Sequence, residues 1–456
     1  MTNKIGSPPS AALGVGQPPD VTLKRRRVQG IPQFAAALVL LVILVLGWQF
    51  LGQFFLTLPG EPPIRAPFLG ARLIVGLLFV GVLTWGVYLN GDWWVAIFVV
   101  LPSFILLGIF VYGFIFWTGY TSLTDSNAVQ QLSGLPANFV GLKNYIELFT
   151  GLLSNRFRID MVNTIFFTLL FIVVCLALGM GLAILLDQKV KGEAIFRTIF
   201  LFPMALSFVV TGVVWQWLFN PNSGLNALPT IIGLPAGTFQ WFISQERWLE
   251  FDWQNLTQIL AVIVLGIVFF FAMLRWSRTR SMTASVIAAL SLLGLAYAFF
   301  AGLPNLTGLA FPEKHGFNLA LIAVVIAAGW QMSGYTMAMY LAGLRGVSDD
   351  LREAARVDGA TEVGVYRYVI FPLLQPITLS AIIILGHISL KIFDLVYTMG
   401  GGNNLQIDMP GINMFFTTFR ASDFAKGAAI ATIMLLMVAV VIVPYLATQL
   451  REDGQS

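Results

Sequence analysis

The feature that most constrains this chain is a series of uncharged apolar stretches, each about 20 residues long, that recurs along its whole length. A helix of that length crosses a bilayer and satisfies its own backbone hydrogen bonds there. Charged residues are 11% of the 456 residues, whereas a soluble domain carries about 25%. We therefore predict an all-α polytopic membrane protein of about ten transmembrane helices, at residues 34–56, 73–89, 94–117, 162–186, 198–219, 257–274, 282–303, 317–344, 376–397 and 427–450.

The basic residues predict how these spans are oriented. Ten spans place both termini on one side, and the cluster Lys24, Arg25, Arg26 and Arg27 before the first span assigns that side to the cytoplasm. Sixteen Lys and Arg fall in the predicted inside regions, against nine in outside regions or outer span ends. We expect a multi-pass protein of a bacterial or archaeal cytoplasmic membrane, with N- and C-termini inside.

Several functions are excluded by what the sequence lacks. The Walker A pattern needs a Gly-Lys step, which occurs nowhere, so the chain is not an ATPase. His315 and His387 lie far apart, and Cys175 is the one cysteine, so we expect no metal site and no catalytic residue. The basic residues are scattered among membrane segments, which argues against a nucleic-acid partner.

Two polar regions interrupt the apolar pattern. Outside, aromatic residues mix with charged ones between Trp241 and Trp253, which predicts a helix lying at the level of the lipid headgroups, an anchor rather than a substrate contact. Inside, the loop 345–371 is dense in charge. Ser348, Asp349 and Asp350 can cap a helix over 351–357. Gly359 permits a reversal before a second short helix from about Thr361.

These patterns predict a helix–turn–helix that projects from the membrane. On its residues alone, a solvated loop with local ion pairs and a docking surface are equally favoured. The loop sequence Glu353, Ala354, Ala355, Arg356, Val357, Asp358, Gly359, Ala360, followed by Ile370 to Leu374 and Pro376, resembles the EAA loop of ABC importer permeases. Further matches to the carbohydrate-uptake branch, the maltose and glycerol-phosphate type, lie at residues 139–145, 196–203, 215–221, 330–344 and 393–401.

The resemblance covers about residues 94–229 and 317–450 and implies a type I ABC importer permease core with extra helices. It divides the chain into a cytoplasmic disordered tail (1–33), an extra N-terminal helix pair (34–93), the first part of the core (94–229), an inserted outside segment with two extra helices (230–316), the second part of the core with the EAA loop (317–450) and a cytoplasmic C-terminus (451–456).

Ionisable side chains inside a predicted span give a candidate substrate path. His387, Lys391 and Asp394 are spaced i, i+4 and i+7, which places them within about 60° on one helix face. That face should look toward protein or water, because a charge facing lipid is costly. A structural Lys391–Asp394 pair is slightly favoured over direct sugar contact. By resemblance to maltose-type permeases, the sugar site would come from this span, with Ser389, and from the span that carries Gln331, Ser333 and Tyr335.

The resemblance implies a permease subunit of an ABC importer for a di- or oligosaccharide or a glycoside. An extracytoplasmic sugar-binding protein would deliver the substrate, a second homologous permease would complete the path, and two ATP-binding subunits, which bind the ATP and Mg, would dock on the EAA loops. Glu353 would make the ionic contact, Ala354 and Ala355 would allow close approach, and Gly359 would form the bend. Asp358 belongs to the same ATPase-coupling set.

Three alternatives remain open at this point. The solute could be another one, such as glycerol phosphate. A secondary transporter would need a coupling carboxylate at mid-membrane, and Asp394 near a helix end suits that role poorly. An intramembrane enzyme would need a nucleophile beside a base, for which His387 and Ser389 are a weak hint.

Overall fold

The computed structural model describes residues 100, 103–188, 191–300 and 312–453. The predicted tail 1–33 and the predicted spans 34–56 and 73–89 lie outside the described residues. The chain divides into two compact units, Met1–Gly108 and Ile109–Ser456, and nearly all of the described residues belong to the second unit.

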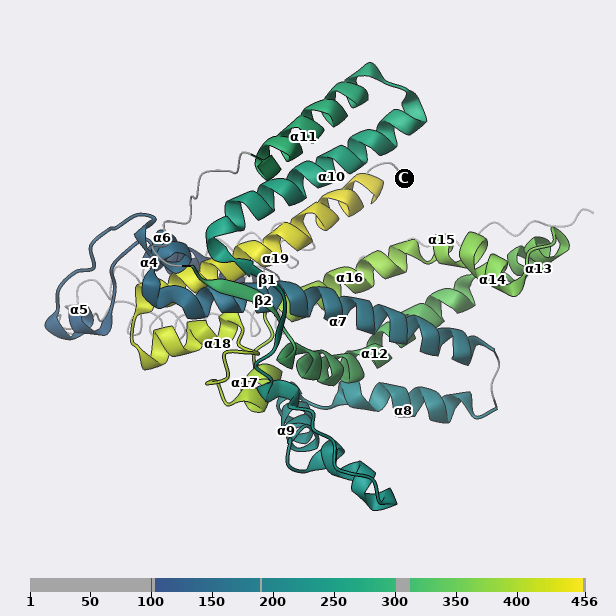
Figure 1. The fold of residues 1–456 in the computed structure, drawn as a ribbon, viewed down its shortest axis with the longest axis horizontal. Helices are drawn as coiled ribbons and strands as arrows, with labels where there is room; N and C mark the ends of the chain where they lie inside the picture. The colour runs from purple at the N-terminus through teal and green to yellow at the C-terminus, as the bar shows by residue number, and fades with distance from the viewer. Residues whose placement is uncertain (1–99, 101–102, 189–190, 301–311, 454–456) are drawn as a thin grey trace, which may run out of the picture. The chain divides into compact units, whose positions relative to one another are not determined.

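Helix α12 (Ala320–Gly346) is the centre of this unit and packs along α7 (Asn155–Asp187) (Figure 1). In its apolar stretch 78% of the residues are buried, against 28% in the span that contains α7. A helix that is apolar on all sides must be covered on all sides. Phe167 and Phe171 of α7 stack with ring centroids 5.3 Å apart and are fully buried against it. Helix α16 (Gln375–Leu390) packs beside this pair.

The predicted span 198–219 is wrong as a single helix. It forms α8 (Glu193–Ala205) and α9 (Phe208–Leu218), which are bent by 99° relative to one another. Pro203 lies in the last turn of α8, where its missing N–H weakens the helix. Leu206 and Ser207 are extended, and the Ser207 hydroxyl accepts a hydrogen bond from the Val210 amide at 3.2 Å, which begins α9 anew.

The predicted span 376–397 is also broken. Helix α16 ends at Leu390, residues 391–393 are not helical, and α17 (Asp394–Gly400) begins with an acidic residue in its first turn, where the helix dipole favours it. Phe393 stacks on Tyr397 at 5.3 Å, which holds the chain in its new direction.

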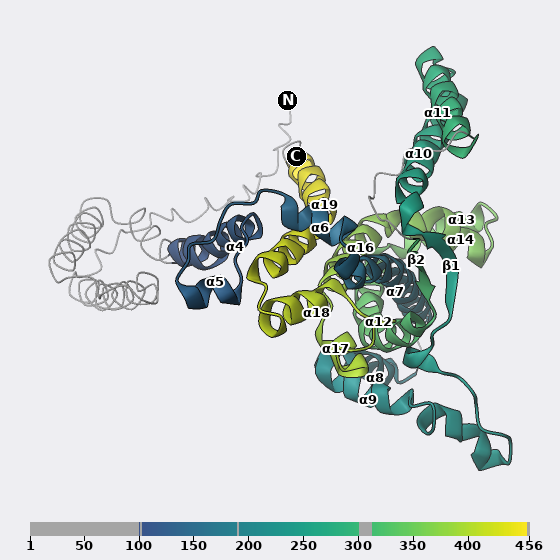
Figure 2. The ribbon, with the colours of Figure 1, turned by 60° about the vertical axis from the view of Figure 1, so that its left-hand side comes forward.

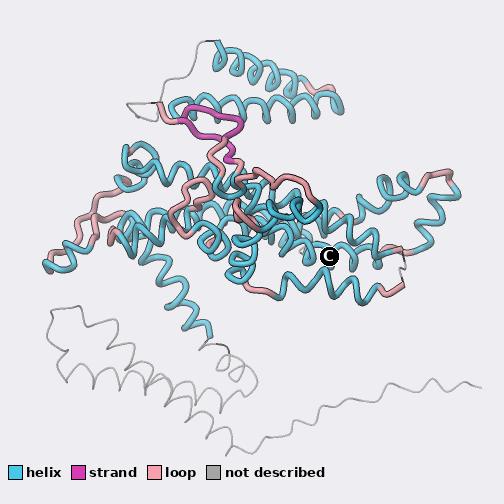
Figure 3. The backbone as a smooth tube through the Cα atoms, turned by 60° about the horizontal axis from the view of Figure 1, so that its bottom comes forward, coloured by secondary structure: helices cyan, strands magenta, loops and turns pink. Residues whose placement is uncertain are grey.

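The aromatic segment predicted as a headgroup helix is instead a strand. β1 (Arg247–Asp252) pairs antiparallel with β2 (Lys314–Asn318), with Trp248 opposite Phe317 and a bulge before Phe251. The partner strand lies more than 60 residues away in sequence, so no local pattern could reveal it. β2 also takes the first residues of the predicted span 317–344. Between the strands the chain forms a helical hairpin of α10 (Leu256–Thr279) and α11 (Met282–Phe300), drawn above the magenta strands in Figure 3.

Shorter elements and the last helix complete the described chain. They are α4 (Phe114–Ser122), α5 (Ala128–Ser133), α6 (Lys143–Thr150), α13 (Asp349–Val357), α14 (Glu362–Val365), α15 (Phe371–Leu373), α18 (Pro410–Phe415) and α19 (Phe424–Asp453), with π-helical turns at Gly108–Gly113, Tyr366–Ile370 and Phe416–Arg420 and 3-10 turns at Leu152–Ser154, Gly224–Ile232, Trp241–Ile243 and Trp253–Asn255.

The prediction of a polytopic helical membrane protein is confirmed. Within the described residues four helices are long and apolar enough to cross a membrane, at Ser103–Ser122, Leu152–Asp187, Trp253–Thr279 and Ala320–Gly346. The count becomes six if each of two bent helix pairs is one span. The number ten stays a prediction.

Candidate coupling loop and substrate path

The loop 345–371 forms the predicted helix–turn–helix, from α13 to α14. Gly359 in the turn has φ +85°, and a Cβ built on it would meet nothing within 4 Å. The glycine is therefore required by backbone conformation and not by close approach. Thr361 caps α14 by accepting a hydrogen bond from the Gly364 amide at 3.2 Å. Ser348 precedes α13 but makes no side-chain capping bond, contrary to the expectation for it.

Two arginines tie this loop to the membrane core. Arg352 of α13 places Nη1 2.8 Å from Asp187 Oδ2 at the end of α7, and its Nη2 donates to the Leu344 carbonyl of α12 at 2.8 Å. Arg345 pairs with Glu193 at the start of α8. The side chains of Arg352 and Asp187 are 16% and 10% exposed, so this pair is shielded from solvent. Arg352 was not among the residues predicted from the sequence to couple the loop. The feature that could have indicated its role is its position in an amphipathic stretch, one residue before Glu353.

The predicted coupling residues separate into an outer and an inner set. Glu353, Ala354, Asp358 and Gly359 are exposed, whereas Ala355 is half-buried against the cluster that contains Leu344. Only one of the two alanines is therefore open to a partner. The outer set is interleaved with exposed apolar side chains, which are Leu351, Val357, Val363 and Tyr368. Apolar groups exposed together among charges are typical of a protein-binding surface. Arg356 and Glu362 join the two short helices, with Nε and Oε1 2.8 Å apart.

Gln331 lies where α12 crosses the break between α8 and α9. Its amide nitrogen donates to the Leu206 carbonyl at 2.7 Å, while its Oε1 is buried without a hydrogen-bond partner. Gly334 follows Gln331 by three residues on α12. A Cβ added to Gly334 would lie 2.1 Å from the carbonyl oxygen of Phe200, so the backbones of α8 and α12 are in direct contact here. An unpaired buried oxygen beside a broken helix is a group that a ligand can satisfy.

The other predicted substrate residues behave differently from one another. Ser333 and Ser389 are buried, and each donates to a carbonyl three residues earlier in its own helix, that of Trp330 at 3.4 Å and that of Gly386 at 2.8 Å. Tyr335 is half-buried against the core. The two serines are therefore already satisfied.

His387, Lys391 and Asp394 do not form one helical stripe, which corrects the sequence analysis. The helix ends between His387 and Asp394, so the assumed 100° step per residue fails there. Lys391 and Asp394 are both exposed and form no ion pair within the described residues, so the expected structural pair is absent from that part of the chain. Only His387 remains on α16, half-buried, with a buried and unpaired Nδ1.

A polar network at the opposite end of α7 was not anticipated. Arg158 is fully buried and binds Glu313 with both Nε (2.8 Å) and Nη2 (2.5 Å). His315 Nε2 lies 2.6 Å from the same carboxylate. Burial opposes ionisation of Glu313, but the hydrogen bonds from Arg158 and His315 hold its pKa below the usual range. Burial lowers the pKa of His315. In the sequence, the sign of this network is the pair Arg156 and Arg158 near the start of a long apolar helix.

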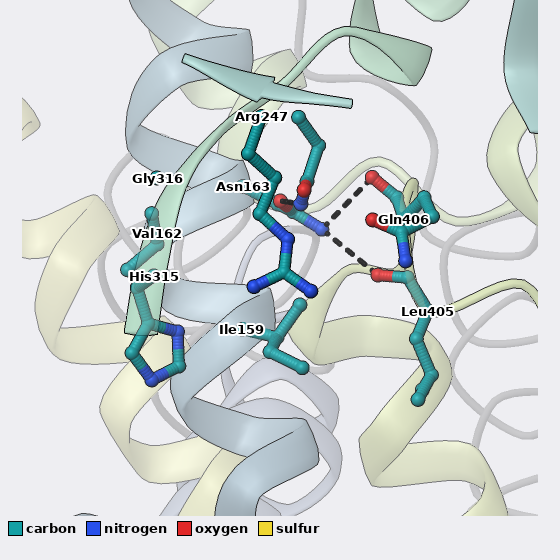
Figure 4. Close-up of a pocket in the computed structure, with 9 residues that line it drawn as sticks. Ile159, Val162, Asn163, Arg247, His315, Gly316, Leu405 and Gln406 are labelled. Carbon is teal, nitrogen blue, oxygen red and sulfur yellow. Dashed lines mark hydrogen bonds between the residues drawn. The ribbon is translucent and has the colours of Figure 1, made fainter. Parts of the chain in front are cut away.

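The same region contains a small pocket between α7, the strand pair and the loop at 405–406 (Figure 4). Asn163 donates to the carbonyls of Leu405 and Gln406 at 3.3 and 3.4 Å, and Arg247 reaches into the pocket beside it. The cavity volume is about 10 Å³, which is room for about one water molecule. The pocket is too small to be the substrate site.

The fold and the loop define the class of protein. Apolar spans surround a buried central helix, two of the surrounding helices are broken, and a charged helix–turn–helix is tied to the ends of α7 and α12. These features define a polytopic helical membrane protein with a charged, exposed helix–turn–helix at one end of its core.

Comparison with known proteins gives the family. The chain belongs to the binding-protein-dependent transport system inner membrane component family, whose model matches residues 255–452. It is 34% identical to a probable ABC transporter permease protein of Pyrococcus horikoshii, over 76% of this chain and 92% of that protein. It is 31% identical to the xylose/arabinose import permease protein of Haloferax volcanii, over 77% of this chain and 86% of that one.

A solved structure with the same fold is a bacterial ABC transporter that imports the acidic polysaccharide alginate. Its TM-score is 0.51 at 15% sequence identity, over 76% of this chain and 93% of that chain. The chain is thus an inner-membrane permease subunit of an ABC importer that works with a substrate-binding protein. It is not itself catalytic, because partner subunits hydrolyse the ATP. The predicted family is confirmed, and the secondary transporter and the intramembrane enzyme are set aside.

Proposed function

We propose that this permease imports a carbohydrate, a di- or oligosaccharide or a glycoside, and forms half of the translocation path. The substrates named for several related permeases support this class: xylose/arabinose in Haloferax volcanii, trehalose/maltose in Thermococcus litoralis and glucose in Saccharolobus solfataricus. A second homologous permease supplies the other half of the path, and an extracytoplasmic sugar-binding protein delivers the substrate. The termini are cytoplasmic, and segment 230–316 is an insertion into the core.

The coupling to ATP is proposed to run through the loop 345–371. The observation that carries this is the Arg352 bridge, because it joins the docking helix α13 to the ends of both core helices. A force on the outer surface around Glu353 therefore reaches α7 and α12 without passing through a flexible connection. Two ATP-binding subunits, which hold the ATP and Mg, would close against this loop and its counterpart on the second permease.

The substrate path is proposed to pass the breaks in the helices. Gln331 has an unpaired carbonyl oxygen at the α8–α9 break, and Lys391 and Asp394 are exposed at the α16–α17 break. Sugar hydroxyls both donate and accept hydrogen bonds, so they can pair with an amide oxygen, an ammonium and a carboxylate. Ser333 and Ser389 contribute shape rather than hydrogen bonds.

The test is a reconstituted complex in liposomes with its own binding protein. ATP hydrolysis and uptake are measured across a panel of mono-, di- and oligosaccharides, glycosides and glycerol phosphate. Stimulation of both by a sugar or glycoside supports the proposal. Stimulation by glycerol phosphate alone would overturn the carbohydrate assignment and leave the importer class intact.

A further inference from the structure

The hairpin of α10 and α11 is a unit with little attachment to the core. Figures 1 and 2 show the two helices side by side and apart from α7 and α12. Small buried residues, Ala272, Ala284 and Ala288 among them, let the helices approach closely. Gln258 also donates to the Ala298 carbonyl at 2.9 Å. The hairpin holds itself together and leaves its other faces open.

Those open faces are apolar and long enough to lie in lipid. Only 6% of the apolar stretch in Trp253–Thr279 is buried. Large apolar side chains are exposed on both helices, for example Phe271 at 63% and Leu293 at 67%. The 24 residues of α10 extend about 36 Å at 1.5 Å per residue, which exceeds a hydrocarbon core of about 30 Å. β1 leads through a short turn into α10 at one end of the hairpin, so a hairpin that spans the bilayer has its tip at the opposite side.

The tip carries positive charge that no residue of the hairpin neutralises. Arg275 and Arg278 lie one turn apart near the end of α10, and Arg280 follows with its guanidinium 5.0 Å from the Trp276 ring centroid. All three arginines are exposed and have no ion pair within the described residues. The sequence has no Asp or Glu between Asp252 and Glu313.

We propose that this tip binds the phosphates of anionic phospholipid headgroups. Guanidinium groups pair with phosphate oxygens in a two-pronged geometry. Trp276 lies among the arginines, between Arg275 and Arg278 in α10 and beside Arg280, and a tryptophan is typical of the membrane interface. The occupant is lipid rather than protein, because the exposed apolar faces of α10, which are long enough to lie in a bilayer, lead directly to the arginines. The hairpin is then a lipid-anchored arm, which goes beyond the transport of substrate.

The test measures which lipids stay with the intact importer. The complex is placed in nanodiscs of phosphatidylcholine and phosphatidylglycerol in equal amounts, extracted in mild detergent and examined by native mass spectrometry. The wild type should retain phosphatidylglycerol in preference. The double variant Arg275→Gln/Arg278→Gln should lower that retention about tenfold or more, since each basic residue near an anionic surface contributes about 1 kcal/mol. Replacing both arginines by Lys should restore much of it.

The matched control removes two charges elsewhere on the predicted cytoplasmic side. Lys191 and Arg197 are exposed near α8, and Lys191→Gln/Arg197→Gln should leave phosphatidylglycerol retention unchanged. Equal loss in both double variants would mean that total charge governs retention, and the proposal would fail. It would also fail if the tip variant kept its lipid and lost a partner subunit, because the tip would then bind protein. Retention does not depend on which solute is transported, so the substrate proposal is tested separately.

Discussion

Arg352 Nη1 lies 2.8 Å from Asp187 Oδ2, across 165 positions of sequence, and joins the loop 345–371 to the end of α7. The second contact of the same guanidinium, to the Leu344 carbonyl, reaches the end of α12. One side chain thus connects the proposed docking helix to the two helices that form the core.

Arg352→Ala should uncouple ATP hydrolysis from uptake. It leaves the Asp187 carboxylate without its ion-pair partner, a loss of about 1.5–3 kcal/mol for a hydrogen bond to a charged group, which corresponds to about tenfold or more in an equilibrium. We expect substrate moved per ATP to fall by that order in liposomes while the subunits stay assembled. Arg367→Ala is the control, because Arg367 lies in the same loop, is exposed, contacts the Tyr368 ring and forms no ion pair with the described residues. Equal coupling in the two variants would contradict the lever role of Arg352.

Gly359→Val should weaken binding of the ATPase subunits without harming membrane insertion. At φ +85° a β-branched residue is strained by about 1–2 kcal/mol, so the turn would rearrange and move α13 relative to α14. Pull-down of ATPase subunits by the tagged permease should fall about tenfold. Gly346→Val is matched, because a Cβ there also meets nothing and the backbone is not in the left-handed region. If both variants bind alike, the turn geometry is irrelevant to docking.

Glu353→Lys tests the same surface by charge. Glu353 is exposed on α13, and a reversed charge against a basic partner surface replaces attraction with repulsion, which costs several kcal/mol at a close interface. ATPase retention and transport should both fall at normal abundance in the membrane. Glu362→Ala should be milder, since it removes only an exposed pair with Arg356. Wild-type assembly of Glu353→Lys would identify the loop as a solvated connector.

Gln331→Met should impair transport more than Ser333→Ala. The methionine keeps the length of the side chain but leaves the half-buried Leu206 carbonyl without its donor, which costs about 1 kcal/mol. The serine hydroxyl bonds only within its own helix, so its loss should be close to neutral. Uptake rate and thermal stability of the complex measure the two effects. An unchanged uptake rate in Gln331→Met would remove this residue from the substrate path.

Acid should destabilise the polar network of Arg158, Glu313 and His315. The pKa of His315 is lowered from 6.5 by burial, so the unfolded chain binds a proton more readily than the folded one, and stability falls as the pH drops below about 6.5. The pKa of Glu313 is lowered from 4.5 in the folded protein. Its contribution to folding stability is therefore complete above pH 4.5 and is lost as the pH falls through its pKa in the folded state. In His315→Gln the melting temperature should stay constant from neutral pH down to the pH at which Glu313 begins to be protonated. A profile identical to that of the wild type would falsify the assignment to His315.

The sequence by itself determined the membrane character, four of the spans and the helix–turn–helix of the loop 345–371. Each of these depends on neighbours along the chain: apolar length for α7 and α12, and the glycine and Thr361 cap for the turn between α13 and α14. Gly359 could be assigned a positive φ because that preference belongs to the residue itself.

Only the tertiary structure decided where long helices break and which distant residues meet. The breaks after Ala205 and Leu390 occur in apolar sequence whose length alone predicts unbroken helices, and they are held by packing and capping. The segment β1 is a strand because it pairs with β2, which follows it in the chain only after the hairpin of α10 and α11. Arg352 finds Asp187, and Arg158 finds Glu313, across more than 150 positions. The position of a charged residue in the sequence does not indicate which residue it will pair with. That partner is decided by the packing of α7 against α12 and by the exclusion of water between them.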